Sequence, residues 1–225
     1  MCGRFTLATP PEILAALFGV DAADWNDPRY NIAPQTRVVT VRSGPGHRTA
    51  QSLLWGVVNP RGGRPLINAR SETAASSPLF GRAFAASRIL VPADGFFEWT
   101  KEAGRRQAYY FQQPKGAPFA FAGIAVASPA GSPSPDPAAA ILTTNASPSV
   151  ARIHARMPLI VAPGDFEAWL DPASKPKTIG EVMSASSRTE WNSRRVGPFV
   201  NNVRNDGPEN IRPAEPAAPP QGSLF

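Results

Sequence analysis

The sequence predicts one compact α+β domain of curved, mostly antiparallel β-sheets with a few short helices. Three observations support this fold class. Short segments typical of strands recur along the 225-residue chain and are separated by Gly- and Pro-rich turns. Helical patterns are few and short. The chain also shows no regular βαβ repeat and no glycine-rich phosphate loop, which argues against a doubly wound nucleotide-binding fold.

The first predicted element is a helix that begins after Thr9. Thr9 suits the N-cap, Pro follows in the first turn, and Glu12 lies three residues after the cap. Gly19 is expected to end this helix. The elements expected next are extended segments at residues 30–34, 37–41, 51–58 and 66–70, and a short helix at residues 78–87.

The second half of the chain continues the alternation of short strands and short helices. Strands are predicted at residues 88–91, 95–100, 108–112, 119–126 and 140–144, an extended segment at 158–161, and a last strand within 191–203. Short helices are predicted at residues 147–153 and 165–170. The domain is expected to span residues 1–212, because residues 213–225 turn to a Pro/Ala-rich composition typical of a disordered tail.

Composition limits the function classes. The formal charge is +6 and the pI about 10.1, which permits a nucleic-acid partner without requiring one. One cysteine excludes an internal disulfide framework, and two histidines make a thiolate/imidazole zinc site unexpected, so neither a metal nor a cofactor is predicted. No apolar run or leader pattern suggests a membrane span or a signal peptide. A cytoplasmic monomer is therefore expected.

Cys2 follows the initiator Met directly, and this position has chemical consequences. If Met1 is removed, Cys2 carries an α-amine and a thiol on adjacent atoms, with reference pKa values near ~8 and ~8.5. Such an aminothiol condenses with an aldehyde to a thiazolidine ring, which a cysteine inside the chain cannot do. The alternative interpretation is a small apolar residue that packs near a terminus.

Three further residues are candidates for acid–base or positioning roles. Glu98 lies among aromatic residues, where partial burial raises a carboxyl pKa toward the range of a general acid or base. His154, between two arginines, could shuttle protons, and the Asn68 amide could orient a reacting group. The alternatives stay open here: a surface glutamate paired with Lys101, a structural histidine, and a strand-end asparagine.

Aromatic residues beside arginines suggest contacts with unpaired bases. Trp55, Phe96 and Trp99 offer flat faces on which bases could stack, at roughly 1–3 kcal/mol each. The alternative is that these rings belong to an ordinary hydrophobic core.

An ordered set of motifs extends over roughly residues 2–212. The segments are MCGRF at residues 1–5, YNIAP at 30–34, WG at 55–56, INARSET at 67–73, DGFFEW at 94–99, IHARMP at 153–158 and VRND at 203–206. In this set the chain closely resembles the SOS response-associated peptidase (SRAP) family, whose members crosslink to abasic sites in single-stranded DNA. No single motif carries the resemblance; the ordered set does.

The resemblance implies an activity and a site. Cys2, freed of Met1 by an autocatalytic peptidase step, would form a thiazolidine with the ring-opened abasic deoxyribose and shield the lesion during replication, with lyase-type reversal. Asn68, Glu98 and His154 would complete the catalytic set. The residues expected to contact DNA are Arg4, Asn31, Trp55, Arg70, Phe96, Trp99, Thr144 and Arg156. Many relatives have a longer loop with a further tryptophan after residue 56, which leaves contacts on that side of the lesion open.

The chain ends in Gln221, Leu224 and Phe225 behind the Pro/Ala-rich segment, which resembles a bacterial sliding-clamp-binding peptide. Such a tail would bring the protein to replication forks at the nucleoid. Two other functions stay open at this point: a thiol peptidase that acts on other proteins, and a non-catalytic single-stranded-DNA-binding module.

Overall fold

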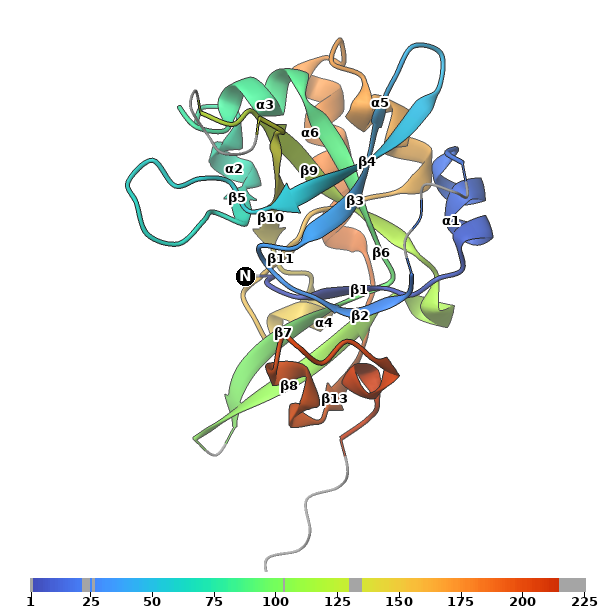
Figure 1. Ribbon diagram of the computed structural model, residues 1–225, viewed down its shortest axis with the longest axis vertical. Helices are drawn as coiled ribbons and strands as arrows, with labels where there is room; N and C mark the ends of the chain where they lie inside the picture. The colour runs from blue at the N-terminus through green and yellow to red at the C-terminus, as the bar shows by residue number, and fades with distance from the viewer. Residues whose placement is uncertain (1, 22–24, 26, 103, 130–134, 215–225) are drawn as a thin grey trace, which may run out of the picture.

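The computed structural model describes residues 2–21, 25, 27–102, 104–129 and 135–214. It consists of two packed β-sheets with short helices at their edges, which confirms the predicted α+β class (Figure 1). The five-stranded sheet contains, in spatial order, β13 (Asn192–Val196), β8 (Arg105–Gln112), β7 (Gly95–Glu102), β1 (Phe5–Leu7) and β2 (Arg29–Ile32). Every pairing in this sheet is antiparallel.

The eight-stranded sheet curves until it closes on itself. Its order is β11 (Arg156–Pro158), β10 (Ala138–Asn145), β4 (Arg48–Trp55), β3 (Arg37–Ser43), β6 (Arg88–Ala93), β9 (Phe119–Val126) and β12 (Ile160–Val161), with β5 (Asn68–Arg70) beside β10. An additional β9–β10 pairing completes the circuit. Only the pairings of β10 with β4 and β5 are parallel, so the expectation of mostly antiparallel strands is confirmed.

Helices surround the eight-stranded sheet in the upper part of Figure 1. They are α1 (Pro11–Phe18), α2 (Ser71–Ala74), α3 (Gly81–Ala86), α5 (Phe166–Leu170) and α6 (Pro176–Ala185), while α4 (Pro148–Ala151) lies near β11 and β13. Short 3-10 turns are η2 (Pro114–Gly116), η3 (Pro163–Asp165), η4 (Ser186–Arg188), η5 (Pro198–Asn201) and η6 (Pro208–Ile211). Among the described residues, no helix combines the length and apolar character that crossing a membrane would need.

Several local predictions need correction. Gly19 ends α1 in the left-handed conformation as expected, but Pro10 occupies the N-cap, and the Thr9 hydroxyl donates to Asp94 instead. No sequence pattern predicted β1, α2 or α6. The predicted segments 51–58, 66–70, 78–87 and 147–153 are displaced from or longer than the elements that form there.

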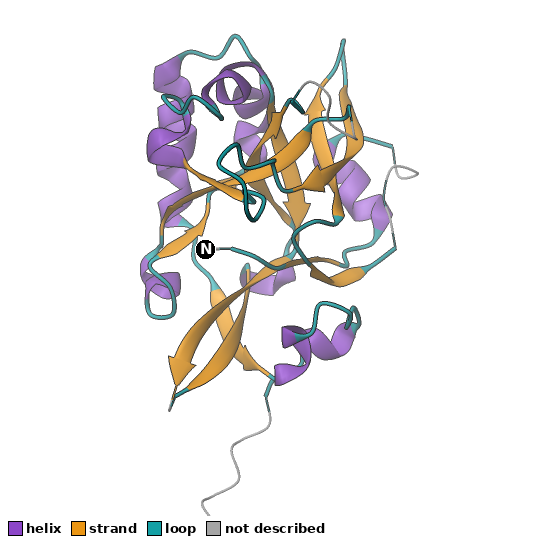
Figure 2. Ribbon diagram, turned by 60° about the vertical axis from the view of Figure 1, so that its left-hand side comes forward, coloured by secondary structure: helices purple, strands orange, loops and turns teal. Residues whose placement is uncertain are grey.

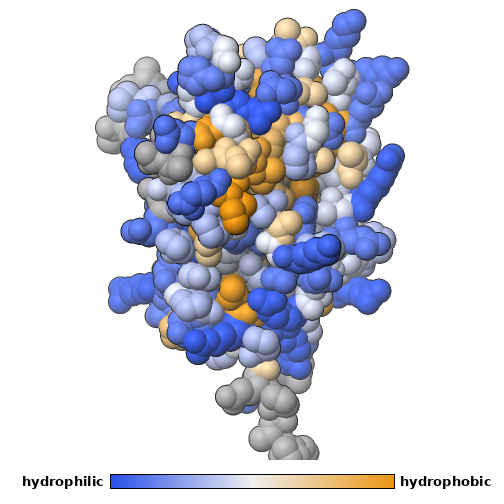
Figure 3. Space-filling model, turned by 90° about the vertical axis from the view of Figure 1, so that its right-hand side faces the viewer, coloured by the Kyte–Doolittle hydropathy of each residue, from blue (hydrophilic) through white to orange (hydrophobic). Residues whose placement is uncertain are grey.

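The core is divided by the two sheets. One buried cluster lies between the eight-stranded sheet and its helices. A second lies between the sheets and contains Cys2, Phe5, Trp55, Phe96 and Trp191. The outer face of the five-stranded sheet packs on η5 through a small cluster that includes Phe97 and Val200. The face on the right-hand side of Figure 1 is largely hydrophilic, with a hydrophobic strip in its upper half and a smaller hydrophobic patch lower down (Figure 3).

Backbone contacts continue a little beyond the expected end of the domain. Val196 forms a β-bridge with Pro213, and the Ala214 amide donates to the Arg195 carbonyl over 2.9 Å. The tail residues Gln221, Leu224 and Phe225 lie outside the described residues, so the clamp-binding peptide stays a prediction.

Candidate active site and nucleic-acid interface

The N-terminal strand is fixed from both sides, and this places Cys2. β1 lies between β7 and β2, with Phe5 opposite both Phe96 and Ile32. The Asp94 carboxylate accepts from the backbone amides of Ala8 and Thr9 over 2.5 and 2.8 Å, and from the hydroxyl of Thr6. A chain end that would ordinarily fray is thereby fixed to the sheet.

Cys2 itself is fully buried, with an exposed fraction of 0%. Its thiol lies 3.7 Å from the Arg4 carbonyl oxygen, and its own carbonyl accepts a 2.9 Å hydrogen bond from the Asn68 Nδ2. Burial raises the pKa of the thiol well above its usual range, and the Glu98 carboxylate raises it further. The thiol is therefore neutral at physiological pH in the chain that still carries Met1.

Asn68 is the first residue of β5, whose pairing with β10 directs the amide toward Cys2. Its Oδ1 is buried and has no hydrogen-bond partner among the described residues. Such an acceptor costs about 1–3 kcal/mol, so a donor that reaches it is favoured. The structure thus brings Asn68 to Cys2. Asn68 is also a strand-end residue, as the alternative expected.

Glu98 is 2% exposed and lies on the same face of β7 as Phe96. Burial raises the pKa of its carboxyl, while the nearby His154 acts in the opposite direction. These mutual effects place Cys2, Glu98 and His154 within electrostatic reach of one another. The alternative of a surface glutamate paired with Lys101 does not apply, because Glu98 is buried and Lys101 is exposed.

His154 lies between α4 and β11 and is partly exposed. Its Nδ1 lies 2.8 Å from the carbonyl oxygen and 3.0 Å from the amide nitrogen of Arg156. Because Nδ1 is engaged by the backbone, Nε2 is the ring nitrogen that can act on a group in the cleft. In the described part of the chain, no three His, Cys, Asp or Glu side chains gather closely enough to hold a metal ion.

Glu98 and His154 line a cleft of about 730 Å³, whereas Cys2 and Asn68 lie outside its lining. It is lined by Gly3, Arg4, Pro34, Arg64, Glu98, Trp99, Thr100, Lys101, Gly104, Arg106 and His154. Four of these side chains are cationic, so the cleft is suited to an anionic ligand. In Figure 2 the N-terminus comes forward between the upper, helix-covered sheet and the hairpin formed by β7 and β8.

Two aromatic residues expected on a DNA path are instead core residues. Trp55 and Phe96 are both 0% exposed. Trp55 donates from Nε1 to the Ile67 carbonyl over 2.9 Å and packs edge-on against Phe5, while Phe96 stacks on Phe111 at 5.0 Å between ring centroids. Neither ring offers a face to a base. Both belong to the buried cluster that contains Cys2.

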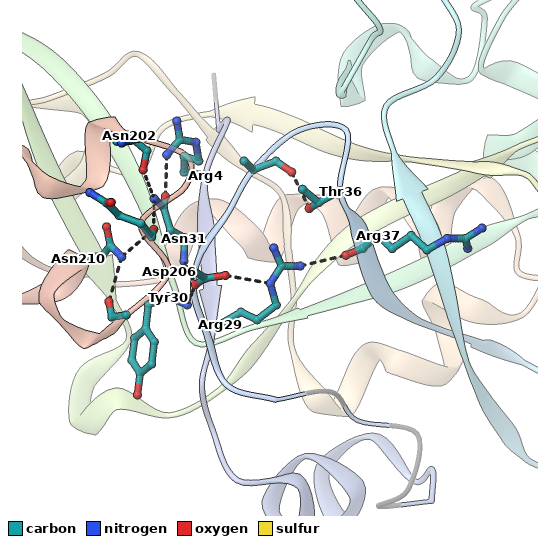
Figure 4. A network of polar contacts seen from close by, with 12 residues as sticks. Arg4, Arg29, Tyr30, Asn31, Thr36, Arg37, Asn202, Asp206 and Asn210 are labelled. Carbon is teal, nitrogen blue, oxygen red and sulfur yellow. Dashed lines mark hydrogen bonds and ion pairs between the residues drawn. The ribbon is translucent and has the colours of Figure 1, made fainter.

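Asn31, also expected to contact DNA, is buried at 1% exposure and holds the chain together (Figure 4). Its Oδ1 accepts from Arg4 Nη1 over 2.6 Å, and its Nδ2 donates to the carbonyls of Asn205 and Asn202 over 2.7 and 3.0 Å. Asp206 accepts from the backbone amide of Asn31 over 2.9 Å. Asn31 therefore links β1 to the C-terminal segment and orients the Arg4 guanidinium at the cleft.

Three further residues expected to contact DNA, Arg70, Thr144 and Arg156, lie outside the lining of this cleft. Arg156 forms a two-bond ion pair with Glu72 at 2.5 and 2.9 Å and also donates to the Thr143 carbonyl. Arg70 is exposed at the end of β5, and Thr144 is partly buried on β10. Arg156 is thus held by protein groups, whereas Arg70 projects to solvent.

Three cationic residues of the cleft were not predicted: Arg64, Lys101 and Arg106. Arg64 comes from the Gly/Pro-rich loop after β4, and the other two face one another across the β7–β8 hairpin. The available signal was a cluster of basic residues on both sides of Gly104, between the strands predicted at residues 95–100 and 108–112.

The fold and site define a class of protein: a two-sheet α+β domain with residue 2, a cysteine, beneath a basic cleft beside a buried carboxyl and an imidazole. A family model described as "SOS response associated peptidase (SRAP)" matches residues 1–203. The chain belongs to this family.

Curated relatives match over almost the whole chain. The abasic site processing protein YedK of Escherichia coli is 32% identical over 226 residues, which cover 95% of this chain and all of that protein. YoqW of Bacillus subtilis, with the same description, is 28% identical over 222 residues, covering 94% of this chain and 99% of the relative. HMCES of Gallus gallus, also described as an abasic site processing protein, is 31% identical and covers 85% of this chain and 68% of the relative.

Solved structures agree on the fold. A protein from Bacteroides thetaiotaomicron superposes with a TM-score of 0.78 at 20% identity, covering 95% of this chain and all of that one. A phage-related protein from Bordetella bronchiseptica superposes with a TM-score of 0.70 at 27% identity, covering 87% and 94%.

Proposed function

We propose that this protein captures abasic sites in single-stranded DNA as a covalent thiazolidine on Cys2. The observation that carries the proposal is the position of Cys2, the second residue, beneath a basic cleft and within reach of Asn68, Glu98 and His154. The description of the relatives as abasic site processing proteins supports the same substrate.

The first step is hydrolysis of the peptide bond between Met1 and Cys2, which consumes one water and releases methionine. Until then the nitrogen of Cys2 is an amide and cannot attack an aldehyde. Cys2 and Glu98 take part in this self-processing. Its product is an α-amine in the position where the neighbouring Glu98 carboxyl can exchange protons with it.

Capture then proceeds in two bond-forming steps on the C1′ aldehyde of the ring-opened deoxyribose. The amine adds to C1′, and the carbinolamine hydroxyl takes a proton from the Glu98 carboxyl and leaves as water. The nitrogen then returns its proton to the Glu98 carboxylate, and a neutral imine remains. The thiol sulfur adds to C1′, and its proton passes through Glu98 to the imine nitrogen. The net change is one aldehyde plus one aminothiol, giving a thiazolidine and one water.

His154 assists opening and closure of the sugar ring, and Asn68 positions the reacting groups of Cys2. When the sugar ring opens, His154 Nε2 removes the proton from the C1′ hydroxyl, the C1′–O4′ bond breaks, and the proton passes to O4′. Ring closure after the crosslink reverses runs the same transfers backward. Asn68 fixes the carbonyl of Cys2, so amine and thiol stay aimed at the same carbon. Cationic side chains of the cleft hold the neighbouring phosphates.

Intact-mass spectrometry after incubation with a single-stranded oligonucleotide that contains one abasic site tests this proposal. The expected product has the mass of the chain without Met1 plus the oligonucleotide minus one water. Cys2→Ala abolishes it, and an oligonucleotide without the lesion gives none. An adduct that persists in Cys2→Ala would contradict the proposal. Cleavage of an added peptide substrate with no adduct would favour a thiol peptidase instead.

A further inference from the structure

The two faces of the β7–β8 hairpin differ in how their charges are balanced. Strand pairing places Glu102 opposite Arg105 and Lys101 opposite Arg106. Because side chains alternate along a strand, these two pairs lie on opposite faces. On the Arg105 face, Glu102 also accepts from the Tyr109 hydroxyl and forms a 3.1 Å ion pair with Arg195. That face therefore has a carboxylate of its own, which is ion-paired with Arg195.

The opposite face carries unbalanced positive charge. Lys101 and Arg106 are like charges directly across the strands, an arrangement that destabilises a sheet. The Arg4 guanidinium adds a third positive charge near these two: burial and the charge of Arg106 lower the pKa of Arg4. In the described part of the chain no carboxylate lies within ion-pair distance of Lys101 or Arg106, whereas Arg29, Arg48 and Arg156 each have one. Such a face is completed by an anion from outside.

The Trp99 ring fixes the position of the Arg106 guanidinium. The Arg106 guanidinium carbon lies 4.6 Å from the centroid of the Trp99 ring, and that of Arg4 lies 5.9 Å from it. The indole Nε1 donates to Asn201 Oδ1 over 2.9 Å, which fixes the ring. Trp99 is therefore a platform that holds a cation at the cleft. The stacked guanidinium keeps its N–H donors available for an acceptor in the cleft.

We propose that Arg106, stacked on Trp99, is a phosphate-binding residue that fixes the path of single-stranded DNA along the β7–β8 hairpin. Stacking holds the guanidinium plane while its edge donates two hydrogen bonds to one phosphate, which is the geometry that arginine favours. This inference rests on the proposed function for the identity of the polyanion. It adds a positioning residue that acts on the DNA backbone and not on the reacting sugar.

The test compares neighbouring arginines on opposite faces of one strand. Arg106→Gln and Arg105→Gln are made in a Cys2→Ala chain, which cannot crosslink, and binding of a fluorescent single-stranded oligonucleotide without a lesion is followed by anisotropy over a series of salt concentrations. Loss of one phosphate contact lowers the slope of log K against log salt by about 0.7, which corresponds to about fivefold weaker binding at 0.1 M salt. Arg105→Gln is expected to change affinity less than about twofold, because Arg105 lies outside the lining of the cleft.

A third variant separates charge from stacking. Arg106→Lys keeps the charge, so the salt slope stays near that of the parent, but affinity falls because the ammonium is not held in a plane. It also replaces Arg106→Gln if that variant fails to fold, as checked by thermal melting. Equal effects of Arg105→Gln and Arg106→Gln, or an unchanged slope in Arg106→Gln, would overturn the assignment.

A measurement with Cys2 intact keeps this inference separate from the proposed function. In the chain with Cys2, Arg106→Gln is expected to raise the concentration of lesion-containing oligonucleotide needed for half-maximal adduct rate about fivefold, with the effect mainly on that concentration and less on the maximal rate. If no adduct forms in the parent, the proposed function fails, while the salt slopes still test Arg106. If adducts form and the half-saturating concentration is unchanged, only the Arg106 assignment fails.

Discussion

Asn31 lies in a motif shared with a DNA-binding family, yet its contacts are internal, and a substitution distinguishes the two roles. Asn31→Ala removes the acceptor for Arg4 Nη1 and the donor to the carbonyls of Asn202 and Asn205. It leaves these carbonyls without that partner in a region where the side chain is 1% exposed. The expected result is a loss of stability and not only a loss of DNA affinity.

The magnitude follows from the three bonds. Two neutral hydrogen bonds contribute about 0.5–1.5 kcal/mol each, and one to a charged group contributes about 1.5–3 kcal/mol. Arg4 keeps its 2.8 Å bond to the Val200 carbonyl, and water reaches the exposed Asn202, which reduces the loss. A net cost of about 3 kcal/mol remains, which for a domain of this size lowers Tm by about 6–12 °C.

The assay is thermal unfolding, followed by circular dichroism, of Asn31→Ala, with Asn192→Ala as the matched control. Asn192 is exposed on β13, and no side-chain hydrogen bond is recorded for it, so its variant is expected to melt within about 1 °C of the parent. If Asn31→Ala melts like the control but binds DNA more weakly, Asn31 is a DNA contact and the structural argument is refuted.

Three further predictions concern Glu98, Gly95 and the tail. Burial raises the pKa of the Glu98 carboxyl, so the folded protein loses stability as pH rises above the ordinary carboxyl pKa near ~4.3. Glu98→Gln is therefore expected to gain in Tm relative to the parent between acid and neutral pH, while its adduct formation slows. A Tm difference independent of pH would contradict this. A Cβ at position 95 would clash with the Tyr110 hydroxyl, so Gly95→Ala is expected to lower the free energy of unfolding by about 1–3 kcal/mol or more in denaturant unfolding. Gly197→Ala, with open space around it, is expected to leave the free energy of unfolding unchanged. A labelled peptide of residues 221–225 is expected to bind a purified bacterial sliding clamp in fluorescence polarisation; no binding at high micromolar concentration would exclude the clamp motif.

Local sequence patterns predicted those elements whose signal is local. The run at residues 119–126 became β9 at the same bounds, and Gly19 ended α1. α6 gave no signal because only Ile179 and Val182 of its ten residues are buried and Gly180 interrupts it. β1 was missed because a strand of three residues is too short to show alternation, although it is central to the five-stranded sheet.

The candidate site also has one part that the sequence alone could suggest and another part that depends on tertiary packing. The chemistry proposed for Cys2, Glu98 and His154 depends on residue type and position, so sequence alone could suggest it. Exposure is set by how the sheets pack, so sequence could not tell that Trp55 is sealed between them while Trp99 reaches the cleft. The motif containing Glu98 also has a structural part: Asp94 holds the N-terminal strand, and Gly95 leaves room for Tyr110.

Several residues of the family motifs make contacts within the protein because they hold the N-terminal strand in place. A nucleophile made from a chain terminus has a free amine only if it is the end of the chain, and chain ends are usually the least ordered part of a domain. Here the terminus is held by β2 and β7, by the Asp94 carboxylate and by the Asn68 amide. In the proposed reaction, fixing the amine and thiol beside Glu98 converts an encounter in solution into a reaction within one complex. Substitutions that loosen this strand should therefore slow capture without touching DNA.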